Sequence, residues 1–121
     1  MCRDDEDYDQ AVKYLHLSVL ASNMLLPCYC VLSNHYHCIV LAKDRAAVCS
    51  AAASFKKRYS MYYAKKYATA SPLGRSHDYA VYLDNDRYLR NAIAYVLRNA
   101  KDQPGGRIDT YPWTSFNDGP R

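Results

Sequence analysis

The chain has 121 residues, which fits one domain with a core of its own, so the fold needs neither disulfides nor a structural metal. Charged residues such as Lys43 and Arg45 interrupt the most apolar stretch, and the first residues are acidic, so we expect neither a membrane span nor a signal peptide. The five cysteines are an odd number without framework spacing, which predicts reduced thiols in a cytoplasmic protein.

The formal net charge of +4 is unevenly spread along the chain. Residues 1–44 carry three basic and six acidic side chains, whereas residues 45–121 carry thirteen basic and six acidic ones. A basic half is typical of a protein that binds a polyanion. A solvated basic face on a protein of another function gives the same pattern, so charge alone does not decide between them.

The first part of the chain predicts a helix followed by a β-hairpin. Residues 4–23 read as a helix, because acidic residues crowd its start, where the helix dipole favours them, and apolar residues recur at three- and four-residue steps. Residues 24–32 and 35–41 are short and rich in apolar residues, which indicates two strands. Ser33 and Asn34 between them suit a tight turn.

A second helix is expected from the Asp44 cap to about Thr69, where a Ser-Pro-Leu-Gly stretch ends it. Residues 77–83 alternate weakly and indicate a third strand. Asp84 or Asn85 then caps a last helix at about 87–101, and the aromatic tail 111–116 is expected to fold back onto the domain. This order predicts one α+β domain, residues 1–121, with helices packed on an antiparallel sheet.

The pair His35 and His37 is the sharpest local feature. Alternate side chains of a strand share a face, so both imidazoles can reach one divalent metal. Short His-x-His patterns also arise by chance, and the alternative is a pair of hydrogen-bonded histidines on a polar sheet face.

The second feature is Tyr95 and Asn99 on the last helix, where residues four apart lie on one face. Tyr95 offers a phenol, and the carbonyl oxygen of Asn99 is able to complete a metal site without adding charge. The alternative for Tyr95 is a half-buried helix tyrosine, since the chain has thirteen tyrosines.

The segment Ser33-Asn-His-Tyr-His-Cys-Ile-Val40 resembles the "PNHxHLLV" pattern of the HUH single-tyrosine transposases, in particular their REP-associated branch. The resemblance continues in family order over nearly the whole chain. Arg3-Asp-Asp-Glu-Asp-Tyr8 resembles "F-x-D-D-E-D", Cys28-Tyr-Cys-Val-Leu32 resembles "AYCLM", Asp86-Arg-Tyr-Leu89 through Tyr95-Val-Leu-Arg-Asn99 resembles "D-x-Y-L…YIHxNPV", and Tyr111-Pro-Trp-Thr-Ser-Phe116 resembles "W-S-S-Y".

The resemblance implies a ferredoxin-like HUH endonuclease fold in a bacterial, nucleoid-associated protein. It implies that His35, His37 and Asn99 bind Mg²⁺ or Mn²⁺ and that Tyr95 is the nucleophile. Imidazole ligands alone would have pointed to zinc or manganese. The implied reaction nicks and rejoins single-stranded DNA at hairpin-associated sites through a 5′-phosphotyrosine, without a nucleotide cofactor.

Basic and aromatic side chains are the candidates for DNA contacts, because cations neutralise phosphates and exposed rings stack on bases. Among the tyrosines of the second helix we expect Tyr63 and Tyr67, rather than those on the core stripe, to be exposed. The candidate set is Lys56, Lys57, Arg58, Tyr63, Lys65, Lys66, Tyr67, Arg75, Arg87, Arg90 and Arg98.

Two departures from the family pattern matter. Family members usually begin with a strand ahead of "F-x-D-D-E-D", so the chain is expected to lack the first strand and to leave a sheet edge that is covered, tolerated or paired in a homodimer. The last helix reads Asn99-Ala-Lys101 where the family has "N-P-V", which removes a helix stop and puts the position of Asn99 in doubt.

Two rival functions remain open, of which the first follows from these departures. The first is a catalytically inactive DNA-binding remnant of a transposase. The second is a structural zinc domain with ligands from Cys28, Cys30, His35 and His37. Buried thiols that pack as small hydrophobic groups are the simpler interpretation of the two cysteines.

Overall fold

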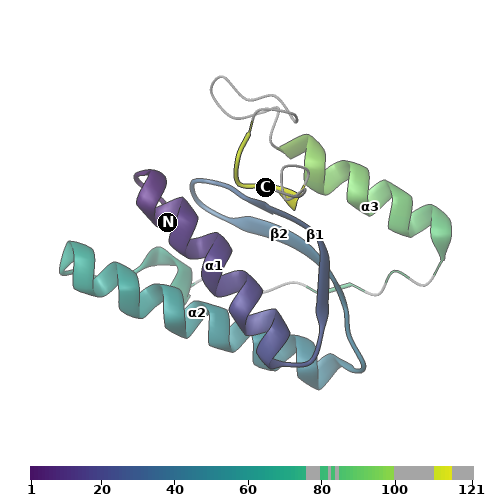
Figure 1. Ribbon diagram of the computed structural model, residues 1–121, viewed down its shortest axis with the longest axis horizontal. Coiled ribbons are helices and arrows are strands. Elements are labelled where there is room, and N and C mark those ends of the chain that lie inside the picture. The colour runs from purple at the N-terminus through teal and green to yellow at the C-terminus, as the bar shows by residue number, and fades with distance from the viewer. Residues whose placement is uncertain (76–79, 82, 84, 100–110, 116–121) are drawn as a thin grey trace.

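The computed structural model describes residues 1–75, 80, 81, 83, 85–99 and 111–115. A two-stranded antiparallel sheet lies between α1 and α2 on one side and α3 on the other (Figure 1). The elements in chain order are α1 (Asp5–Ala21), β1 (Leu25–Val31), β2 (Tyr36–Leu41), α2 (Arg45–Tyr67), the short 3-10 helix η1 (Pro72–Arg75) and α3 (Asp86–Arg98). The predicted α+β class is confirmed at this level.

Each α-helix begins at a side chain that accepts a hydrogen bond from the first turn. Asp4 accepts from the backbone of Asp7 at 2.9 Å, Asp44 from Ala47 at 2.8 Å, and Asn85 from Tyr88 at 2.9 Å. These bonds satisfy backbone donors that have no partner within the helix. The Asp44 cap is confirmed, and of the two caps considered for the last helix the structure selects Asn85.

The register of the hairpin decides which side chains share a face. Cys30 lies opposite His37 and Cys28 opposite Ile39, whereas Tyr29 lies opposite Cys38. Cross-strand partners point to the same side of a sheet and neighbours along a strand point to opposite sides. His37 and Cys30 therefore share one face of the hairpin.

The two faces build separate hydrophobic clusters. The larger cluster joins α1 and α2 to the face that carries Tyr29 and Val31, with Phe55 and Tyr59 of α2 almost fully buried. The smaller cluster joins α3 to the other face, where Val96 packs with the set Cys28, Cys30, Leu32, Ile39 and Tyr111. The smaller cluster holds α3 against the hairpin and thereby positions the histidine face beside it.

The tail returns to the outer edge of β1, as the sequence predicted. Val31 donates its backbone N–H to the carbonyl of Trp113 at 2.9 Å, and Cys30 forms an antiparallel bridge with Thr114. The backbone N–H of Tyr29 donates to the hydroxyl of Ser115 at 3.0 Å. The outer edge of β1 is thus covered at positions 29–31, which is one of the three outcomes expected for a sheet edge in this chain.

The predicted third strand lies mostly outside the described residues. Of that range, the structure describes Ala80, Val81 and Leu83, and these three lie in no strand. The observed α1 and α2 are a few residues shorter than predicted at their ends, and α3 begins one residue earlier than predicted, as is usual for boundaries read from sequence. None of the described helices has the length and hydropathy of a membrane span.

Candidate active site

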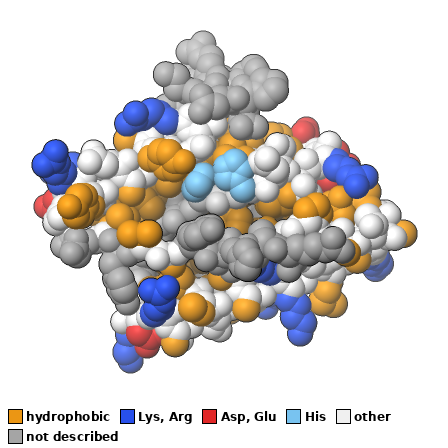
Figure 2. Space-filling model, turned by 180° about the vertical axis from the view of Figure 1, so that it is seen from behind, with side chains coloured by type: hydrophobic (Ala, Val, Ile, Leu, Met, Phe, Trp, Pro, Cys, Tyr) orange, Lys and Arg blue, Asp and Glu red, His pale blue; other side chains and the backbone are white. Residues whose placement is uncertain are grey.

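The two histidines of the hairpin lie side by side. His35 closes the turn, where its carbonyl accepts the backbone N–H of Leu32 at 2.8 Å, and His37 lies on β2. The ring centroids of His35 and His37 are 4.9 Å apart with an edge-to-face arrangement. His35 is exposed and His37 is half-buried. The rear face of the molecule shows histidine side chains at the surface among hydrophobic ones (Figure 2).

Tyr95 of α3 joins this pair. Its ring centroid lies 5.4 Å from that of His37, again edge to face. Its neighbour Val96 is 5% exposed in the smaller cluster, whereas Tyr95 itself is 60% exposed. α3 therefore buries Val96 against the sheet and leaves the preceding residue, Tyr95, at the surface beside His37. The structure brings His35, His37 and Tyr95 together, as the sequence predicted.

The environment of His37 favours its neutral form. Burial lowers the pKa of His37, and the neighbouring His35 lowers it further, because a second positive charge would be repelled. A neutral imidazole offers a lone pair, which is the form that binds a metal.

The geometry fits two imidazoles on one cation. With the bonds of about 2.0–2.1 Å that zinc makes to imidazole nitrogen, two imidazoles on a shared octahedral or tetrahedral ion have ring centroids roughly 4.5–5.3 Å apart. The observed 4.9 Å between His35 and His37 falls in that range, which is also a usual separation for two rings packed edge to face. A third donor is close in sequence to Tyr95: Asn99 follows α3 directly, and its amide nitrogen donates to the carbonyl of Tyr95 at 2.7 Å. That bond uses the amide nitrogen of Asn99 and not its oxygen, and Asn99 is the C-cap of α3.

The zinc alternative concerns Cys28 and Cys30, which lie on the same face of the hairpin as His37. No group of three or more histidine, cysteine, aspartate or glutamate side chains within those residues is arranged to hold a metal. Cys28 and Cys30 are buried, and burial raises the pKa of Cys30 to about 12, which disfavours the thiolate that zinc requires. These two cysteines pack in the smaller cluster as hydrophobic side chains.

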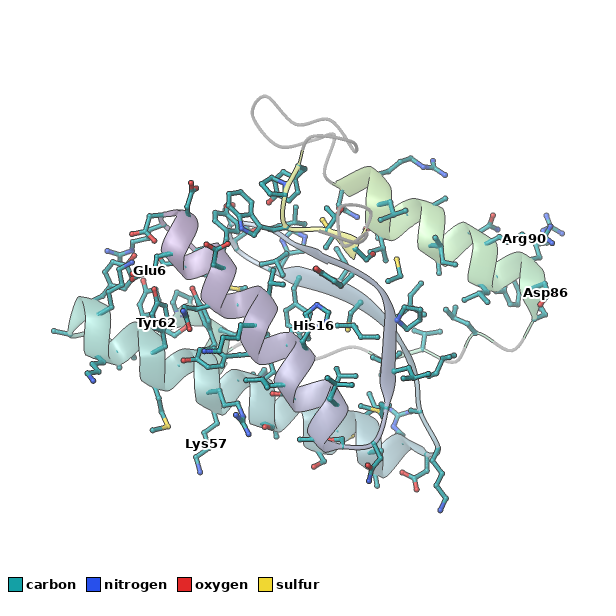
Figure 3. All side chains as sticks on the ribbon, in the orientation of Figure 1. Glu6, His16, Lys57, Tyr62, Asp86 and Arg90 are labelled. Atoms are coloured by element: carbon teal, nitrogen blue, oxygen red, sulfur yellow. The ribbon has the colours of Figure 1, made fainter. Side chains whose placement is uncertain are left out.

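The predicted DNA-binding residues fall on both sides of the sheet. Lys57, Arg58 and Lys65 are exposed on α2, which packs on the face opposite to the histidines, and Lys56 is half-buried there. Lys57 extends from α2 away from the body of the molecule (Figure 3). The three arginines Arg87, Arg90 and Arg98 are exposed on α3, the helix that carries Tyr95. The side chain of Arg75 lies outside the described part of the structure.

Two of the aromatic candidates are not placed for stacking on DNA. The expectation that Tyr63 is exposed is wrong, since Tyr63 is 2% exposed in the larger cluster and helps α2 pack on the domain. Tyr67 is half-buried, and its hydroxyl donates to the carboxylate of Asp7. Helical periodicity predicts Tyr62 on the core stripe, and Tyr62 does pack against the larger cluster; the stripe is wider than predicted and includes Tyr63 as well.

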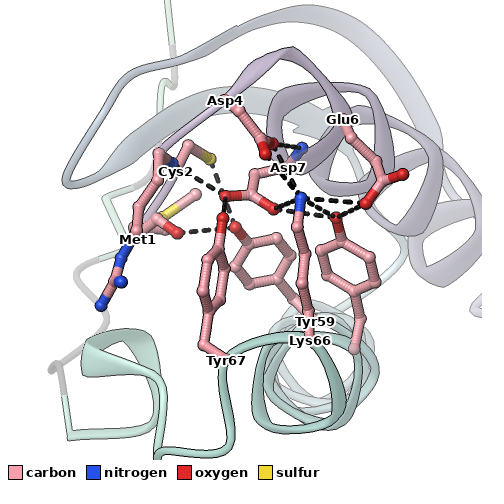
Figure 4. Close-up of polar contacts among 10 residues, drawn as sticks. Met1, Cys2, Asp4, Glu6, Asp7, Tyr59, Lys66 and Tyr67 are labelled. Atoms are coloured by element: carbon pink, nitrogen blue, oxygen red, sulfur yellow. Dashed lines mark hydrogen bonds and ion pairs between the residues drawn. The ribbon is translucent and has the colours of Figure 1, made fainter.

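Lys66 belongs to a polar cluster at the α1–α2 contact rather than to a DNA surface. Its ammonium group lies 2.7 Å from Asp4, 2.9 Å from Glu6 and 3.0 Å from Asp7 (Figure 4). Burial lowers the pKa of Lys66, but hydrogen bonds to these carboxylates outweigh it and raise that pKa. A lysine held by three carboxylates is a poor partner for a phosphate. The prediction that Lys66 binds DNA is therefore replaced by a structural role at the α1–α2 contact.

Asp7 is the centre of that cluster and was not singled out from the sequence. The side chain is fully buried and accepts hydrogen bonds from the backbone N–H of Arg3 at 2.9 Å, from Tyr62 at 2.8 Å, and from Tyr67. Burial raises the pKa of Asp7, but these bonds and Lys66 outweigh it and hold the pKa well below its usual range. The acidic start of α1 was attributed to the helix dipole alone, and only the path of α2 reveals these partners.

Similarity to known proteins does not identify a family for this chain. Comparison with family models, with curated proteins and with solved structures gives no significant match for this chain.

Proposed function

We propose that this chain is a metal-dependent tyrosine transposase with an HUH-type fold, which nicks and rejoins single-stranded DNA at hairpin-associated sites. The observation that carries the proposal is the row of rings His35, His37 and Tyr95. Their centroids are 4.9 Å and 5.4 Å apart, although they come from a turn, a strand and a distant helix. The resemblance to the HUH pattern assigns these same three residues.

The exposure of Tyr95 supports a role as nucleophile. A phenol that is 60% exposed is accessible to a DNA strand, and its position beside His37 places it next to the proposed cation site. A buried core tyrosine such as Tyr59 lacks this access, since it is 0% exposed and donates to the carbonyl of Met1 at 2.7 Å. Its exposure and its ring contact with His37 together distinguish Tyr95 from the tyrosines of the core.

The chain's own residues divide the reaction between them. His35, His37 and the amide oxygen of Asn99 would hold a Mg²⁺ or Mn²⁺ ion, which when bound supplies positive charge for the scissile phosphate. The Tyr95 oxygen attacks phosphorus in line, the bond to the 3′-oxygen breaks, and that oxygen leaves as a hydroxyl with a proton. The 5′-phosphate stays on Tyr95 as a diester. A 3′-hydroxyl of another strand then displaces the phenol, which takes back a proton.

The arginines of α3 are the nearest cations for the cleaved strand, since they share the helix of Tyr95. Arg98 lies three residues after Tyr95, so both are on one side of the helix. The exposed cations of α2 lie on the opposite side of the sheet and would contact DNA outside the cleaved segment. The proposed DNA contacts are therefore Arg98 on the side of Tyr95, Arg87 and Arg90 nearer the start of α3, and Lys57, Arg58 and Lys65 on α2.

The test is a covalent adduct. The protein is incubated with an end-labelled oligonucleotide that carries a hairpin and flanking single strand, with Mn²⁺ or Mg²⁺, and resolved under denaturing conditions. A labelled band at the mass of protein plus DNA is expected, and it should be absent without metal and in Tyr95→Phe.

Tyr88→Phe is the matched control, because Tyr88 lies two turns earlier on α3 and is 55% exposed, close to the exposure of Tyr95. This variant should form the adduct normally. Retarded migration of the hairpin without any adduct would overturn the enzyme and indicate a DNA-binding remnant. An adduct that persists in Tyr95→Phe would assign the chemistry to another residue.

A further inference from the structure

Asn34 makes a side-chain contact that the proposed chemistry has not used. Its amide oxygen lies 2.5 Å from Nδ1 of His35, a hydrogen bond between neighbours in the hairpin turn. With the amide oxygen as acceptor, this bond requires the proton on Nδ1 of His35, which is the Nδ1–H tautomer. From the sequence, Asn34 was interpreted only as a turn residue.

This bond fixes which nitrogen of His35 has a lone pair. A neutral imidazole carries one proton, so a proton on Nδ1 leaves Nε2 as the atom able to bind a metal. A side-chain acceptor behind a metal-binding histidine also holds the ring in one orientation and raises its basicity. His35 has particular need of such support, because it is exposed in the turn.

His37 is held in a different way. It is half-buried on β2, with its ring packed edge to face against Tyr95, so its orientation follows from packing. The two histidines thus have unequal support: burial and ring contacts act on His37, whereas the exposed ring of His35 is hydrogen-bonded to Asn34.

We infer that Asn34 is a positioning residue of the metal site, which holds His35 as the Nδ1–H tautomer with Nε2 directed to the cation. The inference rests on the proposed function, which gives the bound cation its catalytic role. The hydrogen bond and the tautomer exist without metal or DNA, and they can be measured in the protein alone.

The first experiment is nitrogen NMR of the histidine rings in metal-free protein at about pH 8.5, above the ordinary histidine pKa of about 6.5. Wild-type His35 is expected to carry its proton on Nδ1. In Asn34→Leu, which keeps the size of the side chain but cannot accept, the population should shift to Nε2–H, the form an unsupported imidazole prefers. Asn34→Asp keeps an acceptor and should keep the Nδ1–H form.

Wild-type His35 with its proton on Nε2 would overturn the inference, and so would an Nδ1–H form that survives unchanged in Asn34→Leu. Because Asn34 is exposed, the leucine variant should fold. If it does not, the wild-type tautomer still decides the question.

The second measurement is Mn²⁺ affinity without DNA, by titration of the paramagnetic ion. Asn34→Leu should bind about 10-fold more weakly than the wild type, and Asn34→Asp should bind at least as well as the wild type. Equal affinity of the wild type and Asn34→Leu would contradict the role. Normal metal binding with no DNA adduct would instead defeat the proposed function and leave the role of Asn34 intact.

Discussion

The α1–α2 contact and the α3 face of the hairpin both gather titratable side chains, but they use them in opposite ways. At the α1–α2 contact, Asp7 is fully buried and its carboxylate is saturated by Tyr62, Tyr67 and Lys66. On the α3 face, His35 and Tyr95 are exposed, and the ring of each packs edge to face against His37.

The difference teaches that a cluster of polar groups indicates a functional site only when some of its polar atoms remain accessible to a ligand. The Asp7 cluster has more charges and shorter contacts, yet its groups satisfy one another, so it stabilises the fold. The histidine face has fewer contacts and is the better place for chemistry. Variants that separate activity from stability should therefore fall on different sides of the molecule.

The largest expected effect is on the α3 face. His37→Ala should reduce the rate of adduct formation at least about 100-fold, or about 2.7 kcal/mol, because it removes a ligand of the proposed cation. His16→Ala, a histidine on α1 outside the site, is the control and should leave the rate within about twofold. Equal losses in the two variants, measured by denaturing gel time courses, would contradict the assignment.

The next effect is on stability at the α1–α2 contact. Asp7→Asn should lower the free energy of unfolding by about 1–3 kcal/mol, because the buried side chain would accept more weakly from the hydroxyls of Tyr62 and Tyr67 and would lose its charge opposite Lys66. Urea denaturation followed by circular dichroism measures this. Tyr95→Phe should change the same quantity by less than about 0.5 kcal/mol, since Tyr95 is exposed. A larger loss of stability in Tyr95→Phe than in Asp7→Asn would contradict the structural role assigned to Asp7.

The third effect is a pH dependence that comes from Asp7. Its pKa is lowered in the folded protein, so the stabilisation is fully present above the unfolded value of about 3.9 and is lost as pH falls through the lower, folded pKa. Stability should therefore decrease as the solution is acidified from about pH 5 downward. Asp7→Asn should show a shallower decrease, and parallel curves for both proteins would exclude Asp7 as the source.

The smallest effect separates the cations of the two faces. Replacing Arg87 and Arg90 of α3 by alanine should reduce the salt dependence of binding to plain single-stranded DNA by about 0.7 for each phosphate that is no longer neutralised. Replacing Lys57 and Lys65 of α2 should leave that slope unchanged and reduce it only for DNA that carries a hairpin stem, by about 0.9 for each such phosphate. Identical slopes for both double variants on both substrates would refute a division of labour between the faces.

The sequence predicted the local parts of this molecule well. Caps such as Asp44, the hairpin, and the shared face of His35 and His37 follow from rules that act within a few residues. The meeting of Tyr95 with that pair came from the resemblance, because the pairing of a strand with a helix nearly sixty residues away has no local signal.

The parts that failed depend on tertiary packing. The width of the buried stripe on α2 depends on how α1 and the hairpin pack on it, so the sequence placed Tyr62 correctly and missed that Tyr63 is buried as well. The role of Lys66 also depends on which helix end lies beside it, since a lysine on a basic helix looks the same whether it meets DNA or Asp4 and Asp7. The sequence does place Asn34, a side chain with a hydrogen-bond acceptor, directly before His35. That pattern predicts a contact between the two, but Asn34 was interpreted as a turn residue.

The most direct test of the shared cation site is line broadening by substoichiometric Mn²⁺, observed on the side-chain signals of the metal-free, DNA-free protein. The proposed site predicts that His35, His37 and Tyr95 broaden first, while Tyr88 and His16 stay sharp. Broadening that begins at the carboxylates of Asp4, Glu6 and Asp7, with Tyr95 unaffected, would contradict it.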